Sequence, residues 1–401
     1  MTNLPPSQSV SALADLYDPL SAQSHEDPYP SYAVLRAQAP VYYCARHDVW
    51  ALSRYADVRA ALRDWQRFTS TQGVEMADYV GFFGEGNFLE LDPPAHDTIR
   101  RILAPRFLTR AMRSYEPIVR QSADEILDEL PNAGEVDLGT GFTQRLPVLT
   151  ICRLLGIPAA QVPWAVTATT EMMTRPAGES GPSDRAAQLR TELVELFRSE
   201  VARRGNGAEH DDILGDIARA IHEGVLTVED IPGICLLLIA AGMETTTSLL
   251  GSIVDALASG AVTAEEILQD GMVSGEAIDE FLRYDAPVQW LCRVTTEPVT
   301  LHGVTIPAGA RVLMLYGSAN RDPEVFDAPD ELRIGRDTSR HLSFGEGIHF
   351  CLGMPLAKLE TRVGIAGLLG RYRRLQSAGS PQRYPSHIIR GFERIPVIVG
   401  D

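Results

Sequence analysis

The chain has 401 residues, 45% of them apolar, and its 53 acidic against 36 basic residues give a formal net charge of −17. This composition supports a large hydrophobic core and excludes a wholly disordered chain, while the acidic balance argues against nucleic acid or an anionic membrane as a general partner. Five widely spaced cysteines without CxxC pairing argue against a disulfide scaffold or a structural zinc site.

The first 24 residues are polar and contain Pro and Ser, which predicts a mobile tail before a single domain over residues 25–401. The N-terminus lacks the basic start and apolar stretch of a signal peptide. The longest uncharged apolar run, residues 234–243, is about half of the roughly 20 residues that cross a bilayer. We therefore expect a cytoplasmic protein, without a membrane span.

Strand formers at residues 41–44 and 49–52 predict a hairpin. Apolar residues then recur every three or four positions, which predicts helices at residues 55–64, 95–110, 114–130, 185–203 and 211–223. Strand signals return at residues 299–301, 304–306 and 312–315. The chain is thus predicted to be mainly α with a small β region, and loops 69–90 and 174–184 are candidate lids over a pocket.

A long helix is predicted from Thr227, a capping residue, to about residue 260. At 1.5 Å per residue it would measure about 50 Å, enough to cross the domain. Glu244 and Thr245 stand in its otherwise apolar middle. They indicate either a functional acid and hydroxyl or a polar flank whose threonines bond to preceding carbonyls.

Cys351 lies in the glycine-dense segment Phe-Gly-Glu-Gly-Ile-His-Phe-Cys-Leu-Gly, residues 344–353, directly before a predicted helix. Nearby N–H groups and the positive end of a helix lower the pKa of a thiol and favour a thiolate ligand. The alternative for a lone cysteine is a buried, inert residue in a turn.

The segment resembles the heme-binding loop of the cytochrome P-450 family, FGxGxHxCxG, with every specified position present, and the resemblance covers nearly the whole chain. It implies the P-450 fold, a triangular helical domain with a long central helix, and heme b as cofactor. Cys351 would be the axial ligand of the heme iron. The loop positions implied at the heme are Phe344, Gly345, His349 and Gly353.

Two pairs of residues with helical spacing support the resemblance. Glu280 and Arg283 can form an ion pair on one helix face, ordinarily a surface pair, which in the family is a buried core pair. Where many members carry an arginine shortly before the heme loop, this chain has Pro-Asp-Glu-Leu at residues 329–332, so the third member of that network is left open. His96 and Arg100, four apart, can face one anionic group. With Arg293 and His349, the resemblance implies that they clamp the heme propionates.

The middle of the long helix matches the family pattern [A/G]GxxT. By resemblance, Ala241 and Gly242 leave room for dioxygen, Thr245 holds it with a water, and Glu244 relays protons. A peroxide-driven enzyme usually replaces the acid and hydroxyl, and a non-catalytic heme sensor does not need them. The presence of Glu244 and Thr245 therefore favours a monooxygenase over a peroxide-driven enzyme and over a non-catalytic heme sensor.

The resemblance implies electrons from a ferredoxin and a flavin-containing ferredoxin reductase, because no flavin or iron–sulfur motif is present in the chain. We expect a monomer with a basic patch for an acidic ferredoxin, although a mixed solvated face is an equal alternative. The patch would comprise Arg100, Arg101, Arg106, Arg110, Lys358 and Arg362.

The sequence resembles most closely the members that demethylate 4-methoxybenzoate. The residues aligned with their carboxylate anchors are Gln72, Leu236, Leu237 and Ala240. None of them carries a charge, so a substrate carboxylate would lose its charged partner, and a small neutral aromatic substrate is expected, hydroxylated or O-demethylated. A terpenoid or another small apolar compound is the alternative. The expected pocket residues are Gln72, Val74, Met76, Phe82, Phe83, Leu237, Val288, Leu291 and Ile389.

Overall fold

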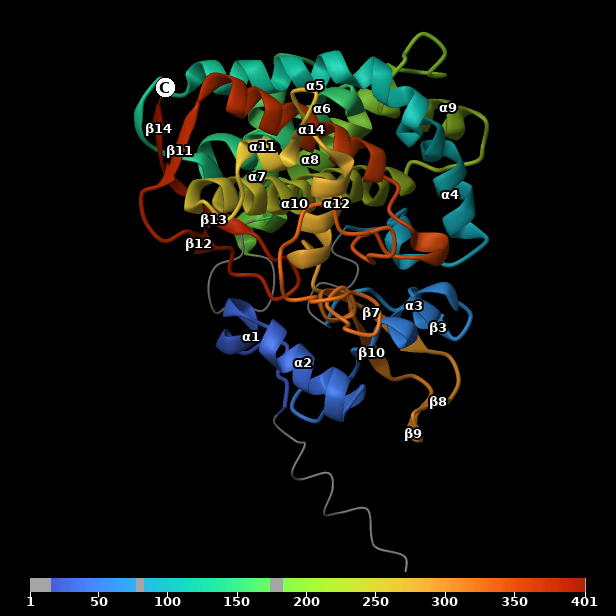
Figure 1. Cartoon of the computed structure of the whole chain (residues 1–401). Coiled ribbons are helices and arrows are strands. Elements are labelled where there is room, and N and C mark those ends of the chain that lie inside the picture. Colours follow the sequence, from blue (N-terminus) through green and yellow to red (C-terminus); the bar gives the residue numbers. More distant parts are fainter. Residues whose placement is uncertain (1–15, 77–82, 174–182, 401) are drawn as a thin grey trace, which may run out of the picture.

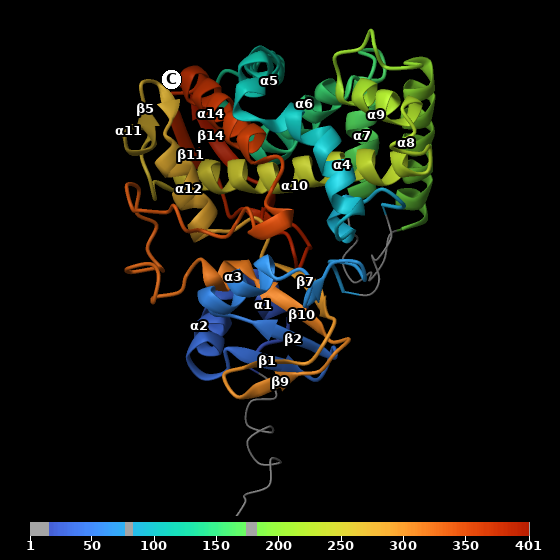
Figure 2. The ribbon, with the colours of Figure 1, turned by 90° about the vertical axis from the view of Figure 1, so that its right-hand side faces the viewer.

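The computed structural model describes residues 16–76, 83–173 and 183–400. Figures 1 and 2 show a large helical part above a smaller part built on a β-sheet, with α10 (Asp230–Ser259) crossing the helical part. The predicted class, mainly α with a small β region, is confirmed.

The smaller part contains a five-stranded sheet with the order β1-β2-β10-β7-β3. β2 pairs antiparallel with β1 and parallel with β10, and β7 runs antiparallel to β10, so that Arg293 lies opposite Val312. The sheet strands are β1 (Val41–Cys44), β2 (Val49–Leu52), β3 (Phe68–Thr69), β7 (Trp290–Thr295) and β10 (Arg311–Leu315). Around the sheet lie α1 (Ala22–Glu26), α2 (Tyr29–Gln38), α3 (Tyr55–Arg63) and α13 (Tyr316–Ala319).

The helical part contains α10 at its centre and further helices around it. These are α4 (Ala95–Leu103), α5 (Thr109–Glu129), α6 (Arg145–Leu155), α7 (Val162–Met173), α8 (Asp184–Arg203), α9 (Ile213–His222), α11 (Ala264–Ile267), α12 (Gly275–Tyr284) and α14 (Met354–Arg371). The described residues also form the short helical turns η2 (Phe88–Glu90), η3 (Ala104–Phe107), η4 (Gly139–Thr143) and η5 (Gly347–His349).

Small sheets and hairpins complete the fold. A three-stranded sheet has the order β11-β14-β4, and three further pairs are two-stranded. The strands are β4 (Gly134–Asp137), β5 (Leu268–Gln269), β6 (Met272–Val273), β8 (Val299–Leu301), β9 (Val304–Ile306), β11 (Arg374–Ser377), β12 (Gln382–Arg383), β13 (Phe392–Arg394) and β14 (Pro396–Gly400).

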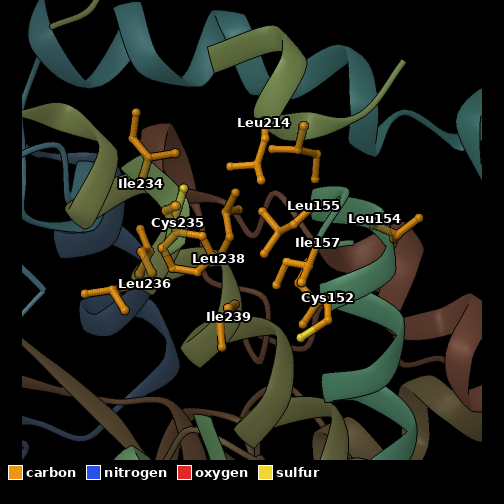
Figure 3. Packing of buried hydrophobic residues seen from close by; sticks show 14 of the residues in the cluster. Cys152, Leu154, Leu155, Ile157, Leu214, Ile234, Cys235, Leu236, Leu238 and Ile239 are labelled. Carbon is orange, nitrogen blue, oxygen red and sulfur yellow. The ribbon is translucent and has the colours of Figure 1, made fainter. Parts of the chain in front are cut away.

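α10 is the core of the helical part because its sequence is apolar on every side. In Figure 3 Ile234, Cys235 and Leu238 of α10 pack with Leu155 of α6 and Leu214 of α9. Among the described residues, it is the one helix long and apolar enough to cross a membrane. With 78% of its apolar window buried inside the protein, it has the character of a core helix.

The predicted hairpin at residues 41–52 is confirmed by β1 and β2. The single helix predicted over residues 95–110 is wrong, because α4 ends at Leu103 and the tight turn η3, with Pro105 near its start, separates it from α5. α10 begins at Asp230 and not at Thr227, since the Asp230 carboxylate accepts hydrogen bonds from the backbone and hydroxyl of Thr227 outside the helix.

The predicted tail is too long. Tyr17 is 3% exposed and packs its ring against Tyr32 at a centroid distance of 5.6 Å, and α1 begins at Ala22. The contact between these two rings therefore places Tyr17 in the folded domain, although the polar composition around it predicts a tail. Residues 1–15 lie outside the described residues, as do parts of both predicted lids, at residues 77–82 and 174–182.

Candidate active site

One cavity lies between the helical part and the sheet, and most of the predicted site residues line it. Its walls include Cys351 and Phe344 from the glycine-rich loop, Thr245 from α10 and Arg293 from β7. Segments more than 300 residues apart in sequence, such as those that carry Leu62 and Ile389, thus meet around a single space.

The loop before α14 presents Cys351 at the start of a helix. The Cys351 N–H donates to the carbonyl of Phe344 at 2.8 Å, which closes the loop, and Gly345 and Gly347 take positive φ angles of 70° and 74°. At Gly347 the close approach of the backbone also requires glycine, because a Cβ there would lie 2.7 Å from the carbonyl oxygen of Leu62.

The thiol of Cys351 experiences opposing influences. Burial raises its pKa, while backbone N–H groups of Gly353 and Met354 and the charge of Arg100 lower it. The same N–H groups and arginine stabilise a thiolate once a metal takes the place of the proton, so the position suits a metal ligand.

Four cationic or hydrogen-bonding side chains converge beside the loop. The rings of His96 and His349 lie 4.5 Å apart, and Arg100 donates to the carbonyl of Phe350 at 2.6 Å. Arg293, 3% exposed, lines the same cavity. The structure therefore brings together all four residues predicted to form the clamp.

The electrostatics of this cluster favour an anion. Burial and the nearby Arg293, His96 and Arg100 lower the pKa of His349 to about 2. His96 is 1% exposed; its Nδ1 lies 2.9 Å from Asp97, whereas its Nε2 has no hydrogen-bond partner in the described part of the chain. Leaving such a nitrogen unsatisfied is costly, so the cluster fits the carboxylates of a bound group such as the propionates of heme.

On the opposite wall, α10 contributes the predicted acid and hydroxyl. Ala241, Gly242, Glu244 and Thr245 all line the cavity, and the Thr245 hydroxyl donates to the carbonyl of Ala241 at 2.8 Å. A Cβ at Gly242 would meet only Ile151, at an ordinary 3.7 Å. The protein atoms alone thus do not require glycine there, which is consistent with space kept for a cavity ligand.

The predicted Glu280–Arg283 pair is fully buried, with contacts of 2.7 and 2.8 Å. The third member, which the sequence left open, is Arg336, whose Nε donates to Glu280 at 3.2 Å. Arg283 also donates to the carbonyl of Asn320, and the Asn320 side chain bonds Leu342 N–H and Ser343, directly before the cysteine loop. The buried pair therefore anchors that loop.

The remaining part of the cavity is mostly apolar. The predicted residues Val74, Phe83, Leu237, Val288, Leu291 and Ile389 line it. Gln72 does not: its side chain is exposed and its carbonyl accepts from Arg311, so the prediction for Gln72 is corrected. Met76 packs beside another core cluster and is not among the lining residues, and Phe82 lies outside the described residues.

The cavity also contains polar residues that the sequence did not single out. Glu75, Asn87 and Glu90 lie in its wall with Glu244, and Glu360 of α14 lines it as well. Glu75 lies in irregular backbone, and Asn87 and Glu90 lie at the short turn η2, so no sequence periodicity marked them. Glu360 resembles any polar position on an ordinary helix.

Two residues of the predicted basic patch are neutralised by neighbours. Arg106 contacts Asp216 at 2.5 Å and Asp211 at 2.6 Å, and Lys358 contacts Asp279 at 2.6 Å. Arg100 points inward to the cavity. Only Arg101, Arg110 and Arg362 of the predicted set are exposed.

Comparison with known proteins places the chain among enzymes of one kind. The family model described as "Cytochrome P450" matches residues 273–389. The vitamin D(3) 25-hydroxylase of Pseudonocardia autotrophica is 35% identical over 399 residues, covering 96% of each chain. The 6-deoxyerythronolide B hydroxylase of Saccharopolyspora erythraea is 33% identical, covering 93% of this chain and 96% of that one.

The solved structures agree with the sequence comparisons. CYP109E1 from Bacillus megaterium in complex with testosterone has a TM-score of 0.81 at 29% identity, over 94% of this chain and 99% of that one. Similarity in sequence and fold along nearly the whole length identifies a heme-dependent monooxygenase. The chain belongs to the cytochrome P450 family, and its cofactor is heme b.

Proposed function

We propose that Cys351 is the axial thiolate ligand of the heme iron and that His96, Arg100, Arg293 and His349 bind the propionates. Arg100, Arg293 and His349 line the cavity, and the ring of His96 contacts that of His349. This convergence, with the His96 Nε2 unpartnered among the described groups, supports the assignment. When bound, heme supplies the activation of dioxygen that lets a monooxygenase insert one oxygen atom into a C–H bond.

On α10, the side chain of Thr245 supplies a hydroxyl to the cavity, and the neighbouring Glu244 supplies a carboxyl. Their positions one residue apart on α10 place an acid and a hydroxyl where protons must enter an apolar space. Glu244 also acts on Tyr384, a partly buried phenol whose pKa is raised first by desolvation and then by the Glu244 charge.

The proposed substrate is neutral and largely apolar. Three carboxyl side chains, Glu75, Glu90 and Glu244, line the cavity, and a substrate carboxylate would add a further negative charge beside them. Apolar side chains, aliphatic and aromatic, make up most of the wall, which suits a neutral hydrocarbon skeleton.

Two size classes remain candidates. The names of the relatives mention vitamin D(3), 6-deoxyerythronolide B and testosterone, which favours a multi-ring or macrocyclic compound of the terpenoid or polyketide kind. The sequence resemblance favours a small methoxyphenol, for which the net reaction would be O-demethylation. The larger class has the broader support, because the relatives cover nearly the whole chain.

An optical titration of the ferric protein tests both the site and the substrate class. After reduction to the ferrous state, a red-shifted carbon monoxide band that is lost in Cys351→Ser is the expected sign of thiolate ligation. A saturable high-spin shift is expected with a neutral sterol or macrolactone and none with 4-methoxybenzoate. A shift with the benzoate alone would overturn the neutral-substrate proposal.

Electrons come from a ferredoxin and its flavin-containing reductase in this proposal. The docking surface, here called the arginine surface, consists of Arg101, Arg110, Arg113 and Arg362, all exposed, with the exposed Leu108 beside them. It lies on α4, α5 and α14, near the cysteine loop, where α5 packs along α14 (Figure 1). Its charge complements an acidic partner despite the net charge of −17.

A further inference from the structure

Arg311, the first residue of β10, holds a stretch of irregular backbone that forms part of the cavity wall. This stretch, residues 70–75, is here called the wall segment. The Nη1 of Arg311 donates to the carbonyl of Glu75 and its Nη2 to the carbonyl of Gln72, both at 3.0 Å. Arg311 itself is not among the described residues that line the cavity. It therefore contacts the wall from outside, through the backbone of the wall segment.

The wall segment contributes to the cavity next to β7. Val74, 4% exposed, and Glu75 both line the cavity. The carbonyl of Val74 accepts a hydrogen bond from the N–H of Cys292 on β7 at 2.7 Å. Leu291 and Arg293, on either side of Cys292, line the cavity as well. The wall segment and β7 thus form one continuous part of the wall.

The opposite end of the wall segment lies beside the proposed propionate clamp. The Oγ of Ser70 is 3.1 Å from the Nε2 of His349. Between the two ends the backbone turns, because Gly73 has a φ of 90° and its N–H donates to the carbonyl of Ser70 at 3.0 Å. This turn does not use the two carbonyls that Arg311 binds. The arginine therefore satisfies backbone groups that no regular strand or helix pairs.

The contact depends on the shape of an arginine side chain. A guanidinium is planar and carries two terminal nitrogens, so it binds two acceptors at once in a fixed geometry, whereas a lysine presents the same charge on a single nitrogen. The strand itself does not depend on this side chain, because Arg311 is paired in the sheet with Val294 on β7 and with Val49 on β2. Replacing the side chain therefore releases the wall segment and keeps the sheet.

We propose that Arg311 is a positioning residue for substrate selectivity. By binding two carbonyls of the wall segment, it fixes Val74 and Glu75 in the cavity wall and so sets the shape that the wall presents to a hydrocarbon skeleton. Arg311 acts through the wall segment and not by contact with heme or substrate. The inference rests on the proposed function, because it takes the cavity as the substrate site.

Hydrogen–deuterium exchange of the heme-loaded protein tests the hold on the wall segment directly. Arg311→Met removes the donors, and Arg311→Lys keeps the charge but not the paired nitrogens. In both variants, deuterium uptake is expected to rise severalfold in peptides that contain the wall segment. Arg371→Met is the matched control, because Arg371 is also half-buried and donates to a loop carbonyl, that of Leu130, at 2.7 Å. Uptake like that of the parent in either Arg311 variant would overturn the proposal.

Optical titration of the ferric protein with two ligands of the heme iron tests the effect on selectivity. Imidazole reports access to the iron, and 4-phenylimidazole adds a ring that must fit against the cavity wall. The ratio of the Kd for 4-phenylimidazole to the Kd for imidazole is expected to rise severalfold in both Arg311 variants, since the ring loses a fixed wall. Arg371→Met is expected to keep the ratio of the parent. An unchanged ratio in the Arg311 variants would overturn the role in selectivity.

These readings are distinguishable from a failure of the proposed function. The exchange experiment uses neither substrate nor iron ligand, so a wrong substrate class leaves its result unaffected. A wrong heme site would instead appear in the parent protein, as a carbon monoxide band that Cys351→Ser does not change. A failure of the role of Arg311 would appear only in the comparison of its variants with the parent.

Discussion

The Nε atom of Arg336 lies 3.2 Å from Oε1 of Glu280, so a second arginine completes the buried pair that Glu280 forms with Arg283. Arg336 also donates to the carbonyls of Ala328 and Glu331. These hydrogen bonds attach the segment between Pro329 and Arg336 to α12. They therefore restrain the chain shortly before the cysteine loop.

Replacing Arg336 is expected to weaken this anchor. Arg336→Leu leaves part of the buried Glu280 carboxylate unpaired. Removing one partner of a buried ion pair costs about 3–5 kcal/mol of unfolding free energy, and a loss of that size is expected here. Urea unfolding of the heme-loaded protein measures this loss. Arg333→Leu is the matched control, because Arg333 reaches Glu280 through its backbone N–H at 2.8 Å while its side chain is 48% exposed. A loss of equal size in both variants would contradict the assignment.

The propionate clamp makes a prediction about heme retention. His96→Phe keeps a ring between Phe88 and His349 but removes the Nε2 that lacks a partner within the described chain. Loss of a hydrogen bond to a charged group costs about 1.5–3 kcal/mol, so heme release is expected to be roughly 10- to 150-fold faster. Transfer of heme to an apoprotein acceptor measures the rate. His222→Phe, at an exposed position on α9, is expected to release heme like the parent.

The Thr245 hydroxyl is expected to control the use of electrons. Thr245→Ala removes the group that bonds the Ala241 carbonyl and faces the cavity, while the adjacent apolar wall is kept. Heme and substrate binding are expected to be unchanged, and product formed per NAD(P)H consumed to fall severalfold as reduced oxygen escapes. Coupling equal to that of the parent, with Thr247→Val as the control for a buried threonine, would argue against this role.

Local patterns predicted local structure well. The strands at residues 41–44 and 49–52 and the helix around Glu280 follow from alternation and spacing, and the cysteine loop from a contiguous motif. Arg336 could not be predicted, because its partnership with Glu280 spans 56 residues and depends on how an irregular segment folds back. The same holds for Glu75 and Glu90, whose positions in the cavity wall are set by tertiary packing of a loop.

Burial explains the other differences between expectation and structure. The polar neighbours of Tyr17 predict a tail, but in the structure its ring contacts Tyr32 and its side chain is buried in the core. Arg106 and Lys358 were counted as free charges, and the acidic side chains that neutralise them lie more than 75 residues away in sequence. Charge patterns in a sequence predict surfaces poorly where distant partners meet.

The arginine surface makes a prediction about electron transfer. Arg101→Glu and Arg110→Glu are each expected to slow reduction by an acidic ferredoxin severalfold at low salt, with the difference shrinking as salt rises. Stopped-flow reduction of the ferric protein in the presence of carbon monoxide, which traps the ferrous heme, measures the rate. Arg374→Glu, at an exposed position on β11 that lies outside the surface, is the control. Equal rates for all variants would exclude this surface as the docking site.

The raised pKa of Glu360 predicts the sign of a pH effect on stability. The folded protein holds the Glu360 proton to a higher pH than the unfolded chain, whose glutamate has a pKa of about 4.3. The contribution of Glu360 is therefore fully present below that value and falls as pH rises toward the folded-state pKa. Glu360→Gln is neutral at every pH and does not lose it. In urea unfolding of the heme-loaded proteins, the stability of Glu360→Gln relative to the parent is expected to rise between pH 5 and pH 8. A difference independent of pH would show that Glu360 carries its charge in the folded protein.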